Sequence, residues 1–295
     1  MSFAFLTYLA PAVLLLFLAV AGYDDWKDRE VPDWIWVVMG AVGTGTLVLG
    51  ALGSSALAIG LDIVGALFAL EHVLPWDRAF ADRESLVGVV EIAIYLAVIA
   101  VAIFALIVHP SDTPAAFLAI VVSVVIARVL FETKLLYGGA DAKAMIITAV
   151  VVPLWPVPLL VPYPAPISMT LLPYVPLAFT MLVDGALLTL AVPIGILLYN
   201  VRHGYWKLPE AFTLYEIPVS ELPRRYVWLR RPRLEANEEV DTSAEDEALR
   251  TEQMKTLTER GITTVWVTPQ LPMVLALAVG ALIGLLFGNI LFWLL

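Results

Sequence analysis

The segment Tyr137–Lys143 (Tyr-Gly-Gly-Ala-Asp-Ala-Lys) separates two long apolar runs, one ending near Leu136 and one beginning near Ala144. Asp141 therefore stands at the edge of a predicted membrane segment, where an ionised carboxylate is costly and usually serves a function. A second acidic segment, Tyr23–Pro32 (Tyr-Asp-Asp-Trp-Lys-Asp-Arg-Glu-Val-Pro), lies where the first apolar run ends. Two carboxylate-bearing segments thus occupy equivalent places at the ends of apolar runs.

The apolar runs define the class of protein. Hydrophobic residues make up 61% of the chain, and several runs reach the roughly 20 residues that a helix needs to cross a bilayer. We therefore predict an all-α membrane protein, a polytopic bundle of about eight transmembrane helices. The N-terminal run lacks a basic region before it, so we take it as a membrane helix and not as a signal peptide. The expected spans are residues 3–22, 34–52, 54–74, 86–108, 115–136, 143–162, 173–201 and 270–295.

The distribution of Lys and Arg predicts the orientation, because these residues concentrate in cytoplasmic segments. With the N-terminus outside, the connections near Gly53, at His109–Pro114 and at Pro162–Leu172 are outer ones, and none contains Lys or Arg. The inner segments receive Lys27 and Arg29, Arg78 and Arg83, Lys134 and Lys143, and every basic residue from Arg202 to Arg260. This orientation predicts a multi-pass protein of the cytoplasmic membrane, with both acidic segments at its cytosolic face.

The domain organisation follows from the same pattern. We expect a transmembrane core over residues 1–201, a cytosolic insert over 202–268 and a C-terminal transmembrane helix over 269–295. Aromatic residues and prolines in the first half of the insert indicate a small ordered unit, whereas the acidic stretch 234–252 is typical of a solvated helix or linker. The basic cluster 224–233 is expected at anionic lipid headgroups, so nucleic acid is not an expected partner.

Composition excludes several kinds of chemistry. The chain has no cysteine, which excludes disulfides, thiolate metal sites and a cysteine nucleophile. The three histidines, His72, His109 and His203, lie in separate segments, so a histidine metal site or a Ser-His-Asp triad is poorly supported. We expect neither a metal nor a cofactor.

Two carboxyl groups that share a proton can hydrolyse a peptide bond without a metal, because one activates water while the other donates a proton. Asp25 and Asp141 are the candidates, and Gly138 and Gly139 would leave room for a substrate backbone beside Asp141. A structural interpretation stays open at this point. Asp141 could cap the sixth helix, and Asp25 could be a solvated charge like Asp24, Asp28 and Asp33.

Both segments resemble motifs of one family, the type IV prepilin peptidases. In its first motif an Asp is followed seven residues later by Pro, usually with an Arg between, and Asp25, Arg29 and Pro32 fill these places. Residues Gly138–Lys143 resemble its second motif, Gly-x-Gly-Asp-x-Lys, except that Ala140 replaces the second glycine. That departure, the segments His203–Leu229 and Thr264–Pro272, and the missing Cys-x-x-Cys insert resemble the archaeal preflagellin peptidase branch.

The resemblance implies a membrane-embedded aspartic endopeptidase that removes the short basic leader of pilin-like or archaellin-like precursors at the cytosolic face. Asp25 and Asp141 would be catalytic, and the precursors and membrane lipid would be the partners. Gly138, Gly139, Lys143, Arg29 and Pro32 would support the pair. Acidic residues that could bind the leader are Asp24, Asp28, Glu30 and Asp33, with Asp77, Asp82 and Glu84 in the second inner loop.

Three other functions compete with this interpretation. A presenilin-like Gly-x-Gly-Asp intramembrane protease is less well supported, because the Pro-Ala-Leu motif is missing and Pro176–Ala178 has the wrong order. A proton-coupled transporter could use Asp62 and Asp184 as a relay, although no internal repeat is visible. A non-catalytic scaffold presenting the insert is the third. We expect structural roles for the other intramembrane ionisable residues, including an i, i+4 pair between Arg128 and Glu132.

Overall fold

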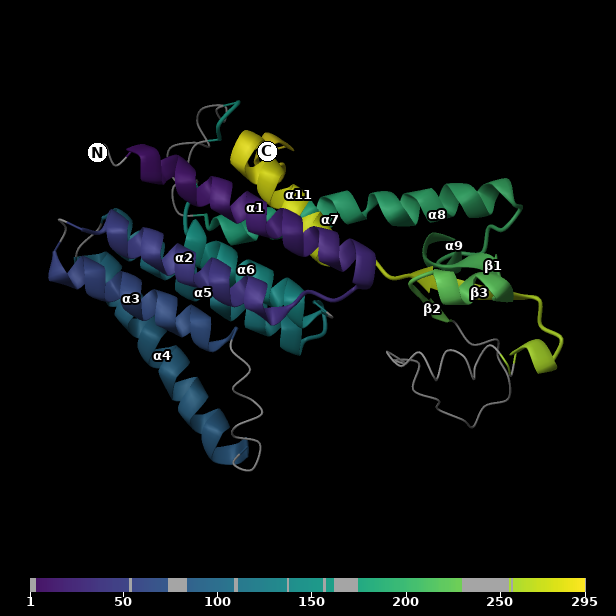
Figure 1. The fold of residues 1–295 in the computed structure, drawn as a ribbon, viewed down its shortest axis with the longest axis horizontal. Coiled ribbons are helices and arrows are strands. Elements are labelled where there is room, and N and C mark those ends of the chain that lie inside the picture. Colours follow the sequence, from purple (N-terminus) through teal and green to yellow (C-terminus); the bar gives the residue numbers. More distant parts are fainter. Residues whose placement is uncertain are drawn as a thin grey trace. The chain divides into compact units, whose positions relative to one another are not determined.

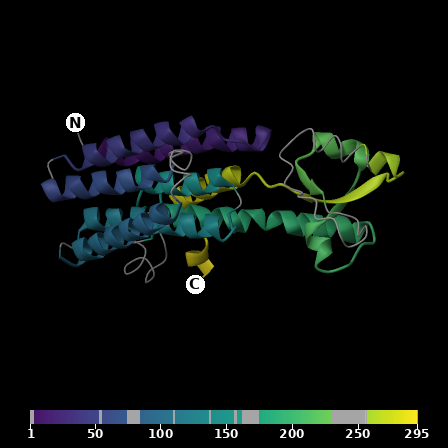
Figure 2. The same ribbon diagram turned by 90° about the horizontal axis from the view of Figure 1, so that it is seen from below.

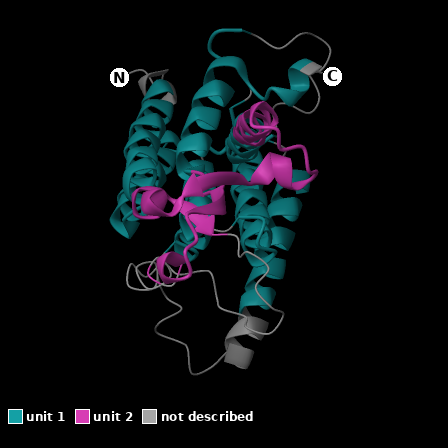
Figure 3. Cartoon of the chain, turned by 90° about the vertical axis from the view of Figure 1, so that its right-hand side faces the viewer, with its two compact units in different colours: residues 1–188, 272–295 teal, residues 189–271 magenta. Residues whose placement is uncertain are grey.

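The computed structural model describes residues 4–52, 55–73, 84–108, 111–136, 138–155, 158–161, 175–229, 255 and 257–294. Most of these residues are helical (Figure 1). The chain divides into two compact units, Met1–Leu188 with Pro272–Leu295, and Thr189–Leu271 (Figure 3). The N-terminal core and the last helix therefore form one unit, although most of the second unit lies between them in the sequence.

The first unit is a helical bundle. Its helices are α1 (Ala4–Asp28), α2 (Asp33–Gly50), α3 (Ala56–Glu71), α4 (Glu84–Val108), α5 (Asp112–Glu132), α6 (Gly139–Val151), α7 (Leu177–Thr189), α11 (Met273–Phe287) and α12 (Leu291–Leu294). Helix α6 contacts α1, α2, α3, α5 and α11, and Figures 1 and 2 show it alongside α2 and α5. Every residue from Ala144 to Val151 is buried, so α6 forms the core of the bundle.

Among the described residues, five helical segments are long and apolar enough to cross a membrane. They are Tyr8–Asp28, Asp33–Gly50, Glu91–Val108, Asp112–Glu132 and Leu177–Arg202. Three other helices that we expected to span are shorter: α3 has 16 residues, α6 has 13 and α11 has 15. The chain is thus a mostly helical protein of membrane type, and the count of eight crossings stays a prediction.

Two predicted spans are longer than the helices found. The span expected over 143–162 ends at Val151, because Val152 takes an extended conformation (φ −138°, ψ 84°) before Pro153. A residue that precedes proline is driven out of the helical region in this way. The span expected over 270–295 is α11, which ends at Gly288 in a positive-φ conformation (φ 79°) that glycine tolerates.

Helices α1 and α11 pack closely, although they lie near opposite ends of the chain. A Cβ atom added at Gly22 would lie 3.1 Å from the Cα of Leu275, so only glycine allows this approach without a shift. The approach brings the C-terminal end of α1 against the N-terminal end of α11. The first acidic segment of the sequence begins at that point.

The second unit contains a small sheet that the all-α expectation did not include. It comprises α8 (Ala191–Arg202), α9 (Glu210–Thr213), β1 (Tyr215–Pro218), a 3-10 helix (Val219–Arg224), β2 (Val227–Leu229) and β3 (Thr264–Pro269). The sheet is antiparallel with the order β1-β3-β2. Residues Thr264–Thr268 (Thr-Val-Trp-Val-Thr) are all β-branched except for one aromatic residue, a composition that favours a strand.

The first half of the insert contains α9, β1, the 3-10 helix and β2, whereas β3 of the same sheet comes from its second half. The structure groups Thr189–Leu271 in the second unit, whereas we expected the insert to cover residues 202–268. The acidic stretch 234–252 lies outside the described residues.

Candidate aspartate site

Asp25 lies in the last turn of α1, and its side chain is buried, with 8% of its surface exposed. Its Oδ2 atom accepts a hydrogen bond of 2.8 Å from the backbone N–H of Val274, the second residue of α11. The N-cap of α11 is Pro272, which makes no side-chain capping hydrogen bond. The carboxylate of Asp25 therefore satisfies a helix N-terminus that the local sequence leaves uncapped.

Asp141 is the third residue of α6 and is also buried, with 6% of its surface exposed. The N-cap of α6 is Gly138, and the backbone N–H of Gly138 donates a hydrogen bond to the Asp141 carboxylate. A Cβ atom at Gly138 would lie only 2.8 Å from Oδ2 of Asp141. The carboxylate is thus folded back over the start of its own helix, and the missing side chain of Gly138 makes room for it.

The fold brings these two carboxyl groups together from distant parts of the sequence. Helices α1 and α6 are in contact, and Asp25 is close enough for its charge to act on Asp141. The neighbouring Asp24 is partly exposed, whereas Asp25 is buried. Among the described residues, no cluster of three or more His, Cys, Asp or Glu side chains could hold a metal ion.

The chain turns sharply directly after Asp25. Arg29 ends α1 with a φ of 59°, a left-handed conformation that non-glycine residues rarely adopt. Its backbone N–H lies 3.2 Å from the Asp25 carbonyl oxygen, and its Nη1 atom donates to the same oxygen at 3.3 Å. The guanidinium charge is close enough to act on the Asp25 carboxylate. Pro32 follows as the N-cap of α2 (φ −61°, ψ 135°).

An ion pair connects the two acidic segments. The Nζ atom of Lys143, in α6, lies 2.5 Å from Oδ1 of Asp33, the first residue of α2. Sequence reasoning assigned Asp33 to leader binding, and Lys143 either to orienting the aspartates or to headgroups. The structure pairs them with each other, so this contact ties the two segments together beside the buried carboxyl groups.

The remaining predicted residues lie nearer the surface. Asp28 pairs with Lys27 at 3.4 Å, and Asp28, Glu30 and Gly139 are exposed. A Cβ atom at Gly139 would meet no atom within 4 Å, so only Gly138 is needed for close packing. Asp77 and Asp82 lie outside the described residues, as do Arg78, Arg83 and the side chain of Glu84.

Sequence reasoning missed the part that α11 plays in the site. The segment Pro269–Pro272 contains no Ser, Thr, Asp or Asn that could cap the helix that follows. A helix start without such a residue indicates that a residue distant in the sequence supplies the cap. Nothing local could have identified Asp25 as the residue that supplies it.

Two other ionisable residues of the apolar helices, Arg128 and Asp184, have partners of their own. Arg128 pairs with Glu132 at 3.0 Å, which confirms the predicted i, i+4 pair, and its guanidinium also lies 3.7 Å from Glu91. Asp184 is fully buried, and its Oδ1 atom accepts a hydrogen bond of 2.9 Å from the backbone N–H of Ile290. Asp62 is buried in α3. Asp184 therefore helps to hold the C-terminal turn of the first unit.

Comparison with known proteins adds no family to this description. No family model matches the chain, and no curated protein is significantly similar to it. What the site does must therefore be inferred from its own residues.

Proposed function

We propose that this protein is a membrane-embedded aspartic endopeptidase that cuts the basic leader from pilin-like or archaellin-like precursors, with Asp25 and Asp141 as its catalytic pair. The observation that carries the proposal is that these two buried carboxyl groups lie on contacting helices, close enough for the charge of Asp25 to act on Asp141. Each belongs to a segment that resembles a motif of the type IV prepilin peptidases. The archaeal preflagellin peptidase branch is the closest in motif pattern.

The pair is suited to peptide hydrolysis because its two members can share one proton. The ionised carboxylate takes a proton from water, whose oxygen attacks the carbonyl carbon of the scissile bond. The protonated partner donates to the carbonyl oxygen, and the nitrogen is protonated as the C–N bond breaks. The carboxyl group that took the proton from water gives it to the leaving nitrogen, and its partner takes a proton back from a hydroxyl of the tetrahedral intermediate, so both return to their starting states. Neither a metal nor a cofactor takes part in the proposed reaction.

Helix dipoles support the same chemistry. Asp141 lies in the first turn of α6, and Asp25 accepts its hydrogen bond from the first turn of α11. The positive ends of two helices therefore face the pair. This arrangement lowers the cost of placing negative charge on two neighbouring carboxyl groups when the proton has been passed to the substrate.

The proposed setting is the cytoplasmic membrane, crossed about eight times, with the N-terminus outside and the carboxyl pair at the cytosolic face. The charge distribution of the sequence supports this orientation. Asp24, Asp28 and Glu30 lie within one turn or loop of Asp25, where they would attract a Lys- or Arg-rich leader. Asp33 is less suited to this role, because Lys143 already pairs with it.

The experiment combines proteoliposomes containing the protein with a pilin-like precursor that carries a basic leader, and follows loss of the leader by gel shift. Asp25→Asn and Asp141→Asn should abolish cleavage, since Asn can accept a hydrogen bond but cannot carry the proton. Asp24→Asn is the matched control and should still cleave, because Asp28 and Glu30 remain to attract the leader. Equal cleavage by all four proteins would overturn the catalytic assignment.

The same assay separates the nearest alternative. A presenilin-like protease would cut within the apolar helix of a substrate, whereas the proposed enzyme cuts between the basic leader and that helix. Mass spectrometry of the product identifies the cleaved bond. A cut inside the apolar segment would replace the proposed function with the alternative one.

A further inference from the structure

The sheet of the second unit has two chemically different faces. One face packs onto a small apolar core that includes Ile217, Val265, Val267 and Leu257. The register pairs Trp228 with Thr268 and Trp266 with Glu216, so these four side chains lie on the other face. This second face carries two tryptophans, and among the described residues the apolar cluster of this unit lies on the first face.

Residues 205–208, which precede α9 and β1, extend this aromatic face. The ring of Tyr205 lies 4.5 Å from that of Trp266, which holds the segment beside the sheet. Trp206 and Leu208, in the same segment, are 67% and 64% exposed, and Trp228 is 42% exposed. We refer to Trp206, Leu208 and Trp228 as the aromatic patch. Such a group of large exposed apolar side chains usually marks a binding surface.

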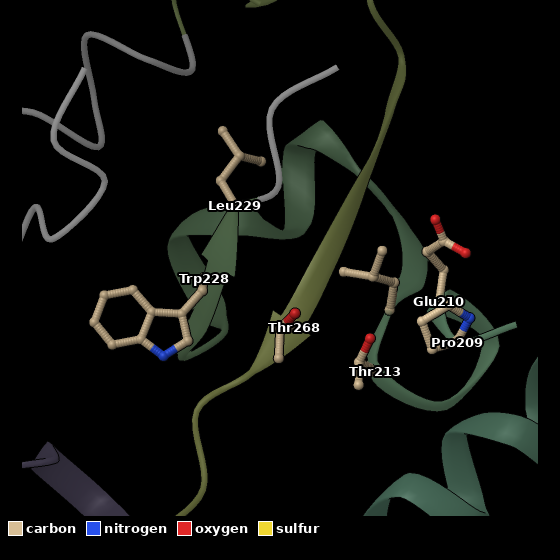
Figure 4. A pocket seen from close by; sticks show the side chains of 7 residues that line it. Pro209, Glu210, Thr213, Trp228, Leu229 and Thr268 are labelled. Atoms are coloured by element: carbon tan, nitrogen blue, oxygen red, sulfur yellow. The ribbon is translucent and has the colours of Figure 1, made fainter. Parts of the chain in front are cut away.

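A shallow hollow lies next to the patch. It has a volume of about 440 Å³ and is lined by Pro209, Glu210, Thr213, Leu214, Trp228, Leu229 and Thr268. Figure 4 shows Thr268 between Trp228 on one side and Glu210 on the other. The hollow therefore joins the aromatic side chain of Trp228 to polar groups that can contact water.

The sheet is fixed to the end of an apolar helix within the same unit. The buried Asn200, in the last turn of α8, donates hydrogen bonds of 2.9 Å and 2.6 Å to the carbonyl oxygens of Ala211 and Leu214. Its own carbonyl accepts a hydrogen bond of 2.9 Å from the N–H of Tyr205. These contacts hold α9 and the sheet against the C-terminal end of α8.

That end of α8 belongs at the surface of a bilayer. The candidate span Leu177–Arg202 has 26 residues. At about 1.5 Å per residue such a helix is roughly 39 Å long, which exceeds the roughly 30 Å hydrocarbon core. In a bilayer of that thickness its last turns would reach the headgroup layer, and Trp206 is four residues beyond Arg202. Later in the sequence, β3 ends at Pro269 and the apolar helix α11 begins at Met273.

We propose that the aromatic patch lies in the headgroup layer of the membrane and binds anionic lipid. Trp side chains favour this layer, since the indole ring is apolar and its N–H can reach water or a phosphate. Lys207 lies between two members of the patch in the sequence and is largely exposed, with Glu210 at 3.8 Å, and Arg224 is also exposed. These cations suit lipid phosphates. A membrane is favoured over a protein partner, because the apolar helix α8 precedes the strands of the sheet in the sequence and the apolar helix α11 follows them.

The chain has no cysteine, so a thiol-reactive label attaches only to a cysteine that is introduced at a chosen position. Spin labels at Trp206→Cys and Trp228→Cys are compared in vesicles containing phosphatidylglycerol. The matched control is Glu259→Cys, an exposed residue near Leu257, which packs on the opposite face of the sheet. Lys207→Cys, also exposed, reports on the same layer if a tryptophan variant does not fold.

We expect the labels at 206 and 228 to be several-fold less accessible than the control to a water-soluble nickel relaxation agent, and more accessible to oxygen. Equal accessibility at all three positions would overturn the proposal. Protection of 206 and 228 that arises only when a basic-leader precursor is added would also overturn it, in favour of a peptide-binding surface. Because the readout needs no cleavage, failure of the proposed peptidase activity would not affect it.

Discussion

The Oδ2 atom of Asp25 lies 2.8 Å from the backbone nitrogen of Val274, a residue 249 positions later in the chain. Through this contact, the first helix of the bundle caps the N-terminus of α11. Asp25 thus has a structural role that is separate from its proposed chemical one. A substitution that removes the carboxylate affects both roles, so variants must be chosen to tell them apart.

Asp25→Ala and Asp25→Asn should differ in stability but not in activity. Loss of a capping oxygen costs about 1 kcal/mol, and up to roughly 2 kcal/mol. Alanine loses the acceptor for Val274, whereas asparagine keeps one. We expect a lower melting temperature for Asp25→Ala than for Asp25→Asn in the same detergent, with cleavage abolished in both.

Asp24→Ala is the control for that comparison, because Asp24 is only partly buried. It should change neither melting nor cleavage appreciably. Equal melting temperatures for the two Asp25 variants would show that the contact with Val274 does not stabilise α11.

The pair Lys143–Asp33 should position the site and contribute little to stability. Its side chains are 23% and 54% exposed, and exposed ion pairs contribute roughly 0.2–1 kcal/mol. Asp33→Asn and Lys143→Gln should each reduce cleavage with little change in melting. A double variant in which the two charges are exchanged should recover much of the loss, because the contact is restored.

Whether the charge-exchanged variant recovers cleavage shows if Asp33 positions the site or binds the leader. If Asp33 bound the basic leader, the exchange would place a lysine where the leader needs an acid, and cleavage would stay low. The coupling between the two positions is measured by a double-mutant cycle.

The two glycines before Asp141 should respond differently to alanine. A Cβ atom at Gly138 would lie 2.8 Å from the Asp141 carboxylate, whereas one at Gly139 would meet nothing within 4 Å. Gly138→Ala must displace the carboxylate, so cleavage should fall sharply. Gly139→Ala should leave the rate nearly unchanged and stabilise α6 by up to about 1 kcal/mol, because alanine favours helix.

Cleavage rates and melting temperatures of these two variants, measured side by side, check the prediction. A larger loss of activity in Gly139→Ala would mean that the substrate backbone approaches that exposed position, and that crowding of Asp141 is not the limiting feature.

Arg29→Gly should separate two effects of this residue: the effect of its backbone conformation on stability and the effect of its charge on cleavage. Arg29 has a φ of 59°, a conformation that costs non-glycine residues roughly 1–2 kcal/mol. Glycine removes that strain but also removes the guanidinium and its hydrogen bond to the Asp25 carbonyl. We expect unchanged or higher stability together with slower cleavage.

Arg29→Lys is the matched variant, because it keeps a positive charge and the strained conformation. It should cleave faster than Arg29→Gly and be no more stable. If both variants cleave at the wild-type rate, the charge at position 29 has no part in the reaction.

The sequence by itself determined the class of the protein and the two residues of the candidate pair. Apolar runs and the charges that end them are local properties, and they placed Asp25 and Asp141 at equivalent positions without any knowledge of the packing. The short strand Thr264–Thr268 is also a local property, because β-branched and aromatic residues favour a strand.

Only the tertiary structure decided which groups these residues contact. The cap on Val274, the pairing of Asp33 with Lys143 and the place of β3 between β1 and β2 each join residues far apart in the chain. Such contacts depend on how closely helices approach, as Gly22 allows for α1 and α11. Hydropathy shows that a helix has a buried side, but it does not show which partner that side meets, because many partners are equally apolar.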